Sequence, residues 1–257
     1  MDELKLRQQI IDACNYLVKT GLIARTWGNV SARLNDHEFL ITPSGLAYEK
    51  TKPEDIVKVN IDTLEYDEFQ RKPSSEKRIH AYAYQLRKDV NFIVHTHQFY
   101  ASAICAEEKD VMIDNTLIPC AKYGLPGTKK LSENVIEVYK NNPNSNMFLM
   151  SKHGTICFGN NNKDALNNAQ ELESICKKLF EQRVPSFYVP NKMKKYLDDY
   201  AQIVPANKNE DQEALRLVTE KNAAANLYAK DSKPIGLIDA TIQHLVYSLK
   251  YSKLKDK

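Results

Sequence analysis

Three histidines of this chain could together form a metal site. His95 and His97 close the apolar run 91–94, and His153 ends another run over 147–152. Side chains at positions i and i+2 of a strand point to the same face, so the first two imidazoles can lie side by side. A third imidazole from another strand end would give three neutral nitrogen ligands around one open position, as in a catalytic zinc site. Gly154, directly after the third histidine, permits close approach of another backbone segment.

Three short loops could bind an anion. The loop at 74–75 is expected to begin a helix that runs to about Arg87, with Ser74 or Ser75 as its N-cap. A helix N-terminus favours a phosphate because its free N–H groups and its dipole attract negative charge. Taken one at a time, each loop is better explained as an ordinary capped turn, and the anion-binding interpretation gains force only if the loops converge on a metal. The small residues of these loops supply N–H donors, hydroxyls and one side-chain amide: Gly28, Asn29, Ser44, Gly45, Ser74 and Ser75.

Glu76 has two possible roles in this sequence. A glutamate in the first turn of a helix normally compensates the helix dipole at the surface. Beside a phosphate-binding serine pair, it could instead be a carboxylate at the edge of a metal site. It would then act as a general acid or base on a carbon next to a polarised carbonyl. The remaining histidines are expected to be ordinary surface or hydrogen-bonded core residues: His37, His80 and His244.

The elements that must position these residues follow a mixed α/β pattern. Helices are expected over 3–19, 74–87, 99–107, 131–141 and 164–180, with a last amphipathic helix over 237–250. Strands are expected over 30–34, 39–42, 56–60 and 92–97, with a further strand leading to His153. The segment 185–215 is polar and interrupted by prolines. Hairpin-like turns early and helical connections later predict one mixed-sheet α/β domain with a C-terminal extension.

Composition narrows the class of protein. The 257 residues are 42% hydrophobic and 27% charged, which is typical of a globular protein, and no apolar run reaches the roughly 18 residues that span a bilayer. The charged N-terminus shows no signal-peptide core. Five isolated cysteines are expected to be reduced core residues of a cytoplasmic protein. A net charge of +3 is too small to indicate a nucleic-acid partner.

The chain resembles the class II aldolase and adducin-head family over roughly residues 5–185. Within that family it is most similar to the zinc-dependent L-fuculose-1-phosphate aldolases and to L-ribulose-5-phosphate 4-epimerase. The strings that carry the resemblance are TWGNVS at 26–31, LITPSG at 40–45, PSSE at 73–76, VHTH at 94–97, IPCAKYGLPGT at 118–128 and KHG at 152–154.

The resemblance implies a fold and a complete set of site residues. The implied fold is a three-layer α/β/α arrangement around a mostly antiparallel sheet, with a catalytic domain over 1–185 and a C-terminal helical extension over 186–257. The implied metal is one Zn2+ per subunit, with Mn2+ or Co2+ as alternatives, bound in a homotetramer whose sites lie near subunit interfaces. The implied ligands are His95, His97 and His153, with Glu76 as a possible fourth ligand and the catalytic carboxylate. The implied phosphate-binding residues are Gly28, Asn29, Ser44, Gly45, Ser74 and Ser75.

The resemblance also implies a reaction. A ketose 1-phosphate would chelate the zinc, breakage of its C3–C4 bond would leave a zinc-stabilised enediolate, and Glu76 would protonate it to release dihydroxyacetone phosphate and an aldehyde. Glutamate after the paired serines favours the aldolases, because the epimerases generally have aspartate there. Dehydratases and decarboxylases of the same scaffold stay open as alternatives. A non-catalytic adducin-head-like interaction module would be expected to lack the three histidines.

Two departures from the family pattern leave the sugar open. The fuculose aldolases carry a tyrosine between the histidine pair and the Ile-Pro-Cys segment, where it protonates the leaving alkoxide. This chain has no tyrosine between Tyr100 and Tyr123. It is also longer than the compact family core, and the extension could cover the site, build an interface or do neither.

Overall fold

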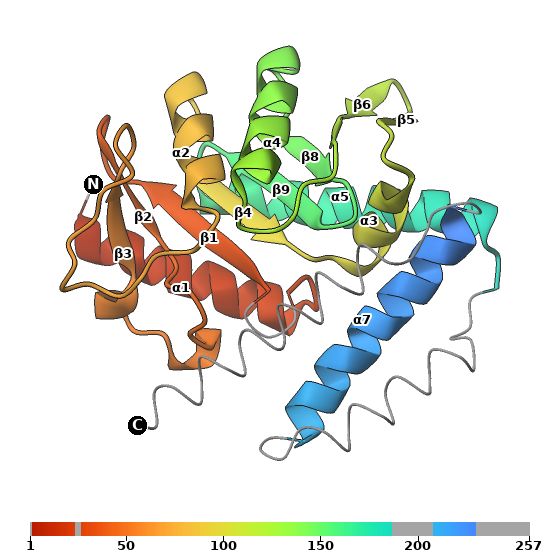
Figure 1. Cartoon of the computed structure of the whole chain (residues 1–257), viewed down its shortest axis with the longest axis horizontal. Coiled ribbons are helices and arrows are strands. Elements are labelled where there is room, and N and C mark those ends of the chain that lie inside the picture. The colour runs from red at the N-terminus through yellow and green to blue at the C-terminus, as the bar shows by residue number, and fades with distance from the viewer. Residues whose placement is uncertain (1, 24–26, 187–207, 230–257) are drawn as a thin grey trace.

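A seven-stranded sheet forms the centre of the described part of the chain, in the order β3-β2-β1-β4-β9-β8-β7 (Figure 1). The computed structural model describes residues 2–23, 27–186 and 208–229. All neighbouring strands pair antiparallel except β7 and β8, which are parallel. The sheet strands are β1 (Gly28–Arg33), β2 (Glu38–Ile41), β3 (Val57–Asn60), β4 (Phe92–Thr96), β7 (Cys120–Ala121), β8 (Met147–Met150) and β9 (Gly154–Gly159). A separate hairpin consists of β5 (Val111–Ile113) and β6 (Thr116–Ile118).

Helices cover both faces of this sheet. One layer contains α1 (Glu3–Lys19), α3 (Phe99–Ile104), α5 (Asn162–Arg183) and α7 (Lys208–Tyr228), and the other contains α2 (Lys77–Leu86) and α4 (Lys129–Asn141). Short 3-10 turns lie at η1 (Tyr48–Lys50), η2 (Pro53–Asp55) and η3 (Cys105–Glu107). The three-layer α/β/α class with a mostly antiparallel sheet, expected from the resemblance, is confirmed.

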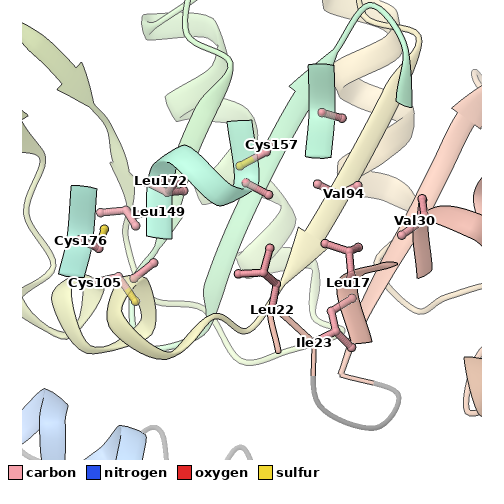
Figure 2. Close-up of a cluster of buried hydrophobic side chains, with 14 of the residues drawn as sticks. Leu17, Leu22, Ile23, Val30, Val94, Cys105, Leu149, Cys157, Leu172 and Cys176 are labelled. Atoms are coloured by element: carbon pink, nitrogen blue, oxygen red, sulfur yellow. The ribbon is translucent and has the colours of Figure 1, made fainter. Parts of the chain in front are cut away.

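The alternation of side chains along β4 builds a hydrophobic core on each face of the sheet. Val94 packs in the cluster beneath α1 and α5, whereas its neighbour Ile93 packs in the cluster beneath α2 and α4. Figure 2 shows Val94 in the first cluster with Leu17 of α1 and Cys157 of β9. Because every residue of β4 is buried, this central strand holds the polar residues at its end in a fixed place.

The predicted element bounds agree closely with the structure at the N-terminus and less well near the site. Helix α1 spans the predicted residues 3–19, and the side chain of Asp2 caps it by accepting from the N–H of Leu4. Helix α2 begins at Lys77, so the prediction that a serine caps it is wrong. A turn precedes the helix, in which Ser74 Oγ accepts from the N–H of Glu76, and Glu76 occupies the N-cap position instead of the first turn.

The C-terminal part differs from the sequence prediction. Helix α7 occupies 208–228, where no helix was predicted from the sequence, and it packs against α3. The amphipathic helix predicted over 237–250 lies outside the described residues. Among the helices that the structure does describe, none has a stretch long and apolar enough to cross a membrane.

Candidate active site

The three predicted histidines lie together at one end of the central strands. His95 is on β4, His97 follows the last residue of that strand, and His153 lies in the turn between β8 and β9. The Nε2 atoms of His95 and His97 are 3.0 Å apart, and one ligand atom from each of the three residues lies within 4.8 Å of the others. The antiparallel neighbours β4 and β9 produce this grouping, because the turn before β9 ends beside the end of β4.

Glu76, the N-cap residue of α2, completes the cluster from the layer that contains α2 and α4. Its Oε2 lies 3.2 Å from His95 Nε2, and its Oε1 lies 3.1 Å from His153 Nε2. A tetrahedral zinc site with metal–nitrogen distances of about 2.0–2.1 Å places its ligand atoms about 3.3 Å apart. The observed separations of 3.0–3.2 Å are close to that value, so the three imidazoles and the carboxylate fit a divalent metal.

A hydrogen bond to the backbone orients the ring of His95 so that its Nε2 faces His97 and Glu76. Its Nδ1 lies 2.7 Å from the backbone oxygen of Thr155, which can only accept, so Nδ1 carries a proton and Nε2 is the ring nitrogen that faces the cluster. Metal-binding histidines usually have such a partner on the second ring nitrogen, because it fixes the tautomer and the ring orientation. This contact therefore favours metal binding by Nε2 of His95.

The charge states of the cluster also suit a metal. Burial raises the pKa of Glu76, but the neighbouring His95 and His153 outweigh that effect and hold its pKa well below the usual range. Burial lowers the pKa of His97 well below its ordinary value, which keeps that imidazole neutral. A neutral imidazole and an ionised carboxylate are the forms that bind metals.

Gly154 is required by the close packing of β9 against β4. A Cβ atom at this position would lie 2.4 Å from the backbone oxygen of Thr96 and 3.2 Å from the ring of His97. The prediction that this glycine permits close backbone approach is confirmed, and its backbone neighbour is the segment that carries the histidine pair.

We expect Gly154→Ala to lower the free energy of unfolding by about 1–3 kcal/mol, since the added methyl group must push these strands apart. Denaturant unfolding measures the change, and metal content is expected to fall with it because His97 is displaced. Ser151→Ala in the same turn is the control, because the buried Ser151 hydroxyl bonds to no described group. Equal stability of Gly154→Ala and wild type would contradict the packing argument.

The predicted phosphate loops come together where β1 begins and β2 ends. An isolated bridge joins Pro43 to Pro73, and the N–H of Ser44 donates to the oxygen of Lys72, which places the loop 44–45 beside the loop 74–75. Gly28 and Asn29 begin β1, which is next to β2, and the side chain of Asn29 reaches Glu76. Gly127 extends this group, because a Cβ atom there would lie 3.8 Å from Ser75 Oγ.

The six residues of these loops are not equivalent. Ser44, Gly45 and Ser75 are exposed and could meet a ligand directly. Ser74 and Asn29 are buried, and their side chains contact Glu76. The structure therefore brings the three loops together, but it directs the Asn29 amide to the Glu76 carboxylate and the Ser74 hydroxyl to the backbone N–H of Glu76.

Two groups near the site were not found from the sequence. Lys221 of α7 is buried and donates to the backbone oxygen of His97, while burial lowers its pKa to about 8. Glu173 of α5 accepts from the N–H groups of Tyr100 and Ala101 at the start of α3. No motif marks a lysine in a polar stretch as a neighbour of a histidine 124 positions away, so only the fold reveals these contacts.

Fold and site together define an α/β protein with a carboxylate and three imidazoles arranged for a metal. Residues 8–180 match the model of the Class II Aldolase and Adducin N-terminal domain. The chain belongs to the class II aldolase and adducin family.

Individual relatives support that placement. The L-fuculose phosphate aldolase of Escherichia coli K12 is 38% identical over 181 residues, which cover 67% of this chain and 81% of the relative. A probable L-ribulose-5-phosphate 4-epimerase of Mycoplasma pneumoniae is 32% identical over 190 residues, covering 66% of this chain and 78% of the relative. A solved L-fuculose 1-phosphate aldolase superposes with a TM-score of 0.64 at 26% identity, covering 82% of this chain and 94% of that one.

Proposed function

We propose that this protein cleaves a ketose 1-phosphate by a metal-dependent retro-aldol reaction, releasing dihydroxyacetone phosphate and an aldehyde. The observation that carries the proposal is the position of Glu76, which contacts both His95 and His153 and directly follows the serine pair 74–75. A proton-transfer group, a metal site and an anion-binding loop therefore lie within a few residues of one another. The similarity to an L-fuculose phosphate aldolase supports the same reaction.

The three imidazoles would hold the divalent metal, for which zinc is the proposed identity. When bound, such an ion acts as a Lewis acid that stabilises negative charge developing on a carbonyl oxygen.

The residues of the chain itself would bind the substrate and move the proton. The exposed N–H groups and hydroxyls of Ser44, Gly45 and Ser75 would hold the phosphate group. Glu76 is ionised at the start, so the step balances when the proton that leaves the C4 hydroxyl passes to Glu76 as the C3–C4 bond breaks, and Glu76 then donates a proton to C3. The burial of Glu76 keeps bulk water from competing for this transfer.

Alternative reactions of the same scaffold differ in their products. A 4-epimerase would return the epimeric ketose phosphate, a dehydratase would release water and a decarboxylase would release carbon dioxide. Glutamate at position 76, where the epimerases generally have aspartate, favours the aldolase. Homotetrameric assembly, a cytoplasmic location and a role of the extension beyond residue 185 stay predictions.

Product analysis tests the proposal against these alternatives. The metal-loaded protein would be incubated in separate reactions with L-fuculose 1-phosphate and with L-ribulose 5-phosphate, and the products followed by NMR. We expect dihydroxyacetone phosphate and one equivalent of aldehyde from the first compound. Formation of the 4-epimer of the second compound, without aldehyde from either, would contradict the proposal in favour of an epimerase.

We expect Ser75→Ala to weaken binding of the phosphorylated substrate and to leave the metal content unchanged. A hydrogen bond to a charged group contributes about 1.5–3 kcal/mol, so KM is expected to rise about tenfold or more, with a smaller change in kcat. Steady-state kinetics measures both constants. Ser174→Ala on the exposed side of α5 is the matched control. An unaltered KM for Ser75→Ala would remove this serine from the phosphate site.

A further inference from the structure

A continuous chain of buried hydrogen bonds leads from the core to Glu76. The Tyr84 hydroxyl lies 2.7 Å from Ser31 Oγ, and this Oγ lies 2.7 Å from His80 Nδ1. His80 Nε2 lies 2.5 Å from Asn29 Oδ1, and Asn29 Nδ2 lies 2.8 Å from Glu76 Oε2. The residues between the two ends are shielded from solvent, since Ser31 and His80 are 0% exposed and Asn29 is 4% exposed.

The repeat distances of a helix and a strand explain how this series of hydrogen bonds forms. Glu76 is the N-cap of α2, and His80 and Tyr84 follow it within the helix at steps of four residues, each a rise of about 6 Å. Asn29 and Ser31 are two residues apart on β1, which is a rise of about 6.6 Å, and their side chains point to the same face. The two repeats nearly match, so the polar side chains of the strand lie between those of the helix.

The donors and acceptors fix the direction of the hydrogen bonds. An ionised Glu76 can only accept, so the Asn29 amide nitrogen donates to it, and Asn29 Oδ1 is left to accept from His80 Nε2. The Nδ1 of a neutral His80 then accepts from the Ser31 hydroxyl, whose oxygen accepts from Tyr84. Burial lowers the pKa of His80 to about 3, which agrees with a neutral ring in a single tautomer.

The Asn29 side chain therefore cannot turn without breaking a bond at each end. Its oxygen is held by His80 and its nitrogen holds one oxygen of Glu76. The Oε2 atom of Glu76 is thereby kept as an acceptor at a fixed position within the histidine cluster. Packing of α2 against β1 does not by itself require these matched donors and acceptors, because apolar side chains at the same positions would pack equally well.

We propose that Asn29 and His80 are positioning residues that hold the Glu76 carboxylate in the orientation needed for proton transfer. The inference rests on the function proposed for Glu76. It gives His80, expected from the sequence to be an ordinary core histidine, a part in turnover, and it gives the Asn29 side chain a role separate from phosphate binding.

Three variants and a paired control test this proposal by kinetics. Asn29→Ala and His80→Leu are expected to lower kcat about 10- to 100-fold, as is usual when a residue that orients a site ligand is removed, while metal content stays unchanged. KM is expected to stay within about twofold of the wild-type value. His80→Gln keeps an N–H near the position of Nε2 and is expected to recover most of the loss. Tyr84→Phe removes the far end of the series and is expected to lower kcat severalfold. Its matched control is Tyr139→Phe, because the buried Tyr139 hydroxyl bonds to no described group.

Crystal structures of the variants provide a readout that does not depend on activity. In His80→Leu the Asn29 amide and the Glu76 carboxylate are expected to rotate away from their wild-type positions, and in His80→Gln to stay. If the wild-type protein cleaves no ketose 1-phosphate, the proposed function fails. The positions of the Asn29 amide and the Glu76 carboxylate in the crystal structures then still test the positioning role. A wild-type kcat in both Asn29→Ala and His80→Leu, or an unmoved carboxylate in His80→Leu, would overturn the proposal. If His80→Leu does not fold, Asn29→Ala supplies both readouts.

Discussion

Replacement of His95 with alanine is expected to remove the bound metal and reduce activity to background. Among the three proposed ligands, His95 has the most fixed geometry, because its Nδ1 donates to the Thr155 backbone and its side chain is 1% exposed. Two imidazoles and a carboxylate would remain, and the Lewis acid that supplies several kcal/mol to the reaction would be lost. We therefore expect turnover to fall by at least about 1,000-fold.

Metal analysis of purified protein and a continuous triose-phosphate assay measure the two effects of His95→Ala. His37→Ala is the matched control, since His37 lies in an exposed turn between β1 and β2. We expect that variant to keep full metal content and full activity. Stoichiometric metal together with wild-type turnover in His95→Ala would show that the histidine cluster is not the metal site.

Glu76→Gln is expected to keep the metal and lose most of its turnover. Glutamine has the size of glutamate, and its side-chain oxygen can still accept from Asn29, so the architecture around it should persist. An amide neither donates nor accepts the transferred proton, and general acid–base catalysis contributes about 100- to 10,000-fold. We expect kcat to fall within that range, with little change in the stability of the protein.

The measurement for Glu76→Gln is kcat with metal content determined on the same sample. Glu133→Gln on the exposed face of α4 is the control for a loss of one negative charge. A Glu76→Gln enzyme with near-normal kcat would remove this carboxylate from its assigned role. Loss of the metal along with activity would instead show that its main function is to bind the ion.

Periodicity predicted much of the scaffold because burial follows it directly. Helix α1 has the predicted bounds, since its apolar spacing continues without interruption to the Thr20–Gly21 end. The start of α2 was not predictable in the same way. Whether Ser74 or Glu76 occupies the N-cap depends on a turn stabilised by the neighbouring loop, which the local sequence does not contain. Helix α7 was missed because its residues are mostly polar and have weak amphipathic spacing.

The site was predictable to the extent that its residues are close in sequence. His95 and His97 follow from strand geometry alone, whereas their meeting with His153 depends on β9 pairing with β4. The contacts of His80 required the angle and register of α2 against β1. The sequence does contain both halves of the pattern: glutamate, histidine and tyrosine at four-residue spacing, and the string Asn-x-Ser at the start of a predicted strand. The meaning of the pattern depends on the two elements packing together.

The central claim, that a metal held by the histidine cluster drives carbon–carbon bond cleavage, is tested most directly by release of dihydroxyacetone phosphate. Chelator-treated protein and the same protein reconstituted with Zn2+ would be incubated with L-fuculose 1-phosphate and related ketose 1-phosphates. The account predicts no release by the metal-free protein, and release matched one-to-one by aldehyde after reconstitution. Equal release by both samples, or none from any ketose 1-phosphate by the reconstituted protein, would contradict it.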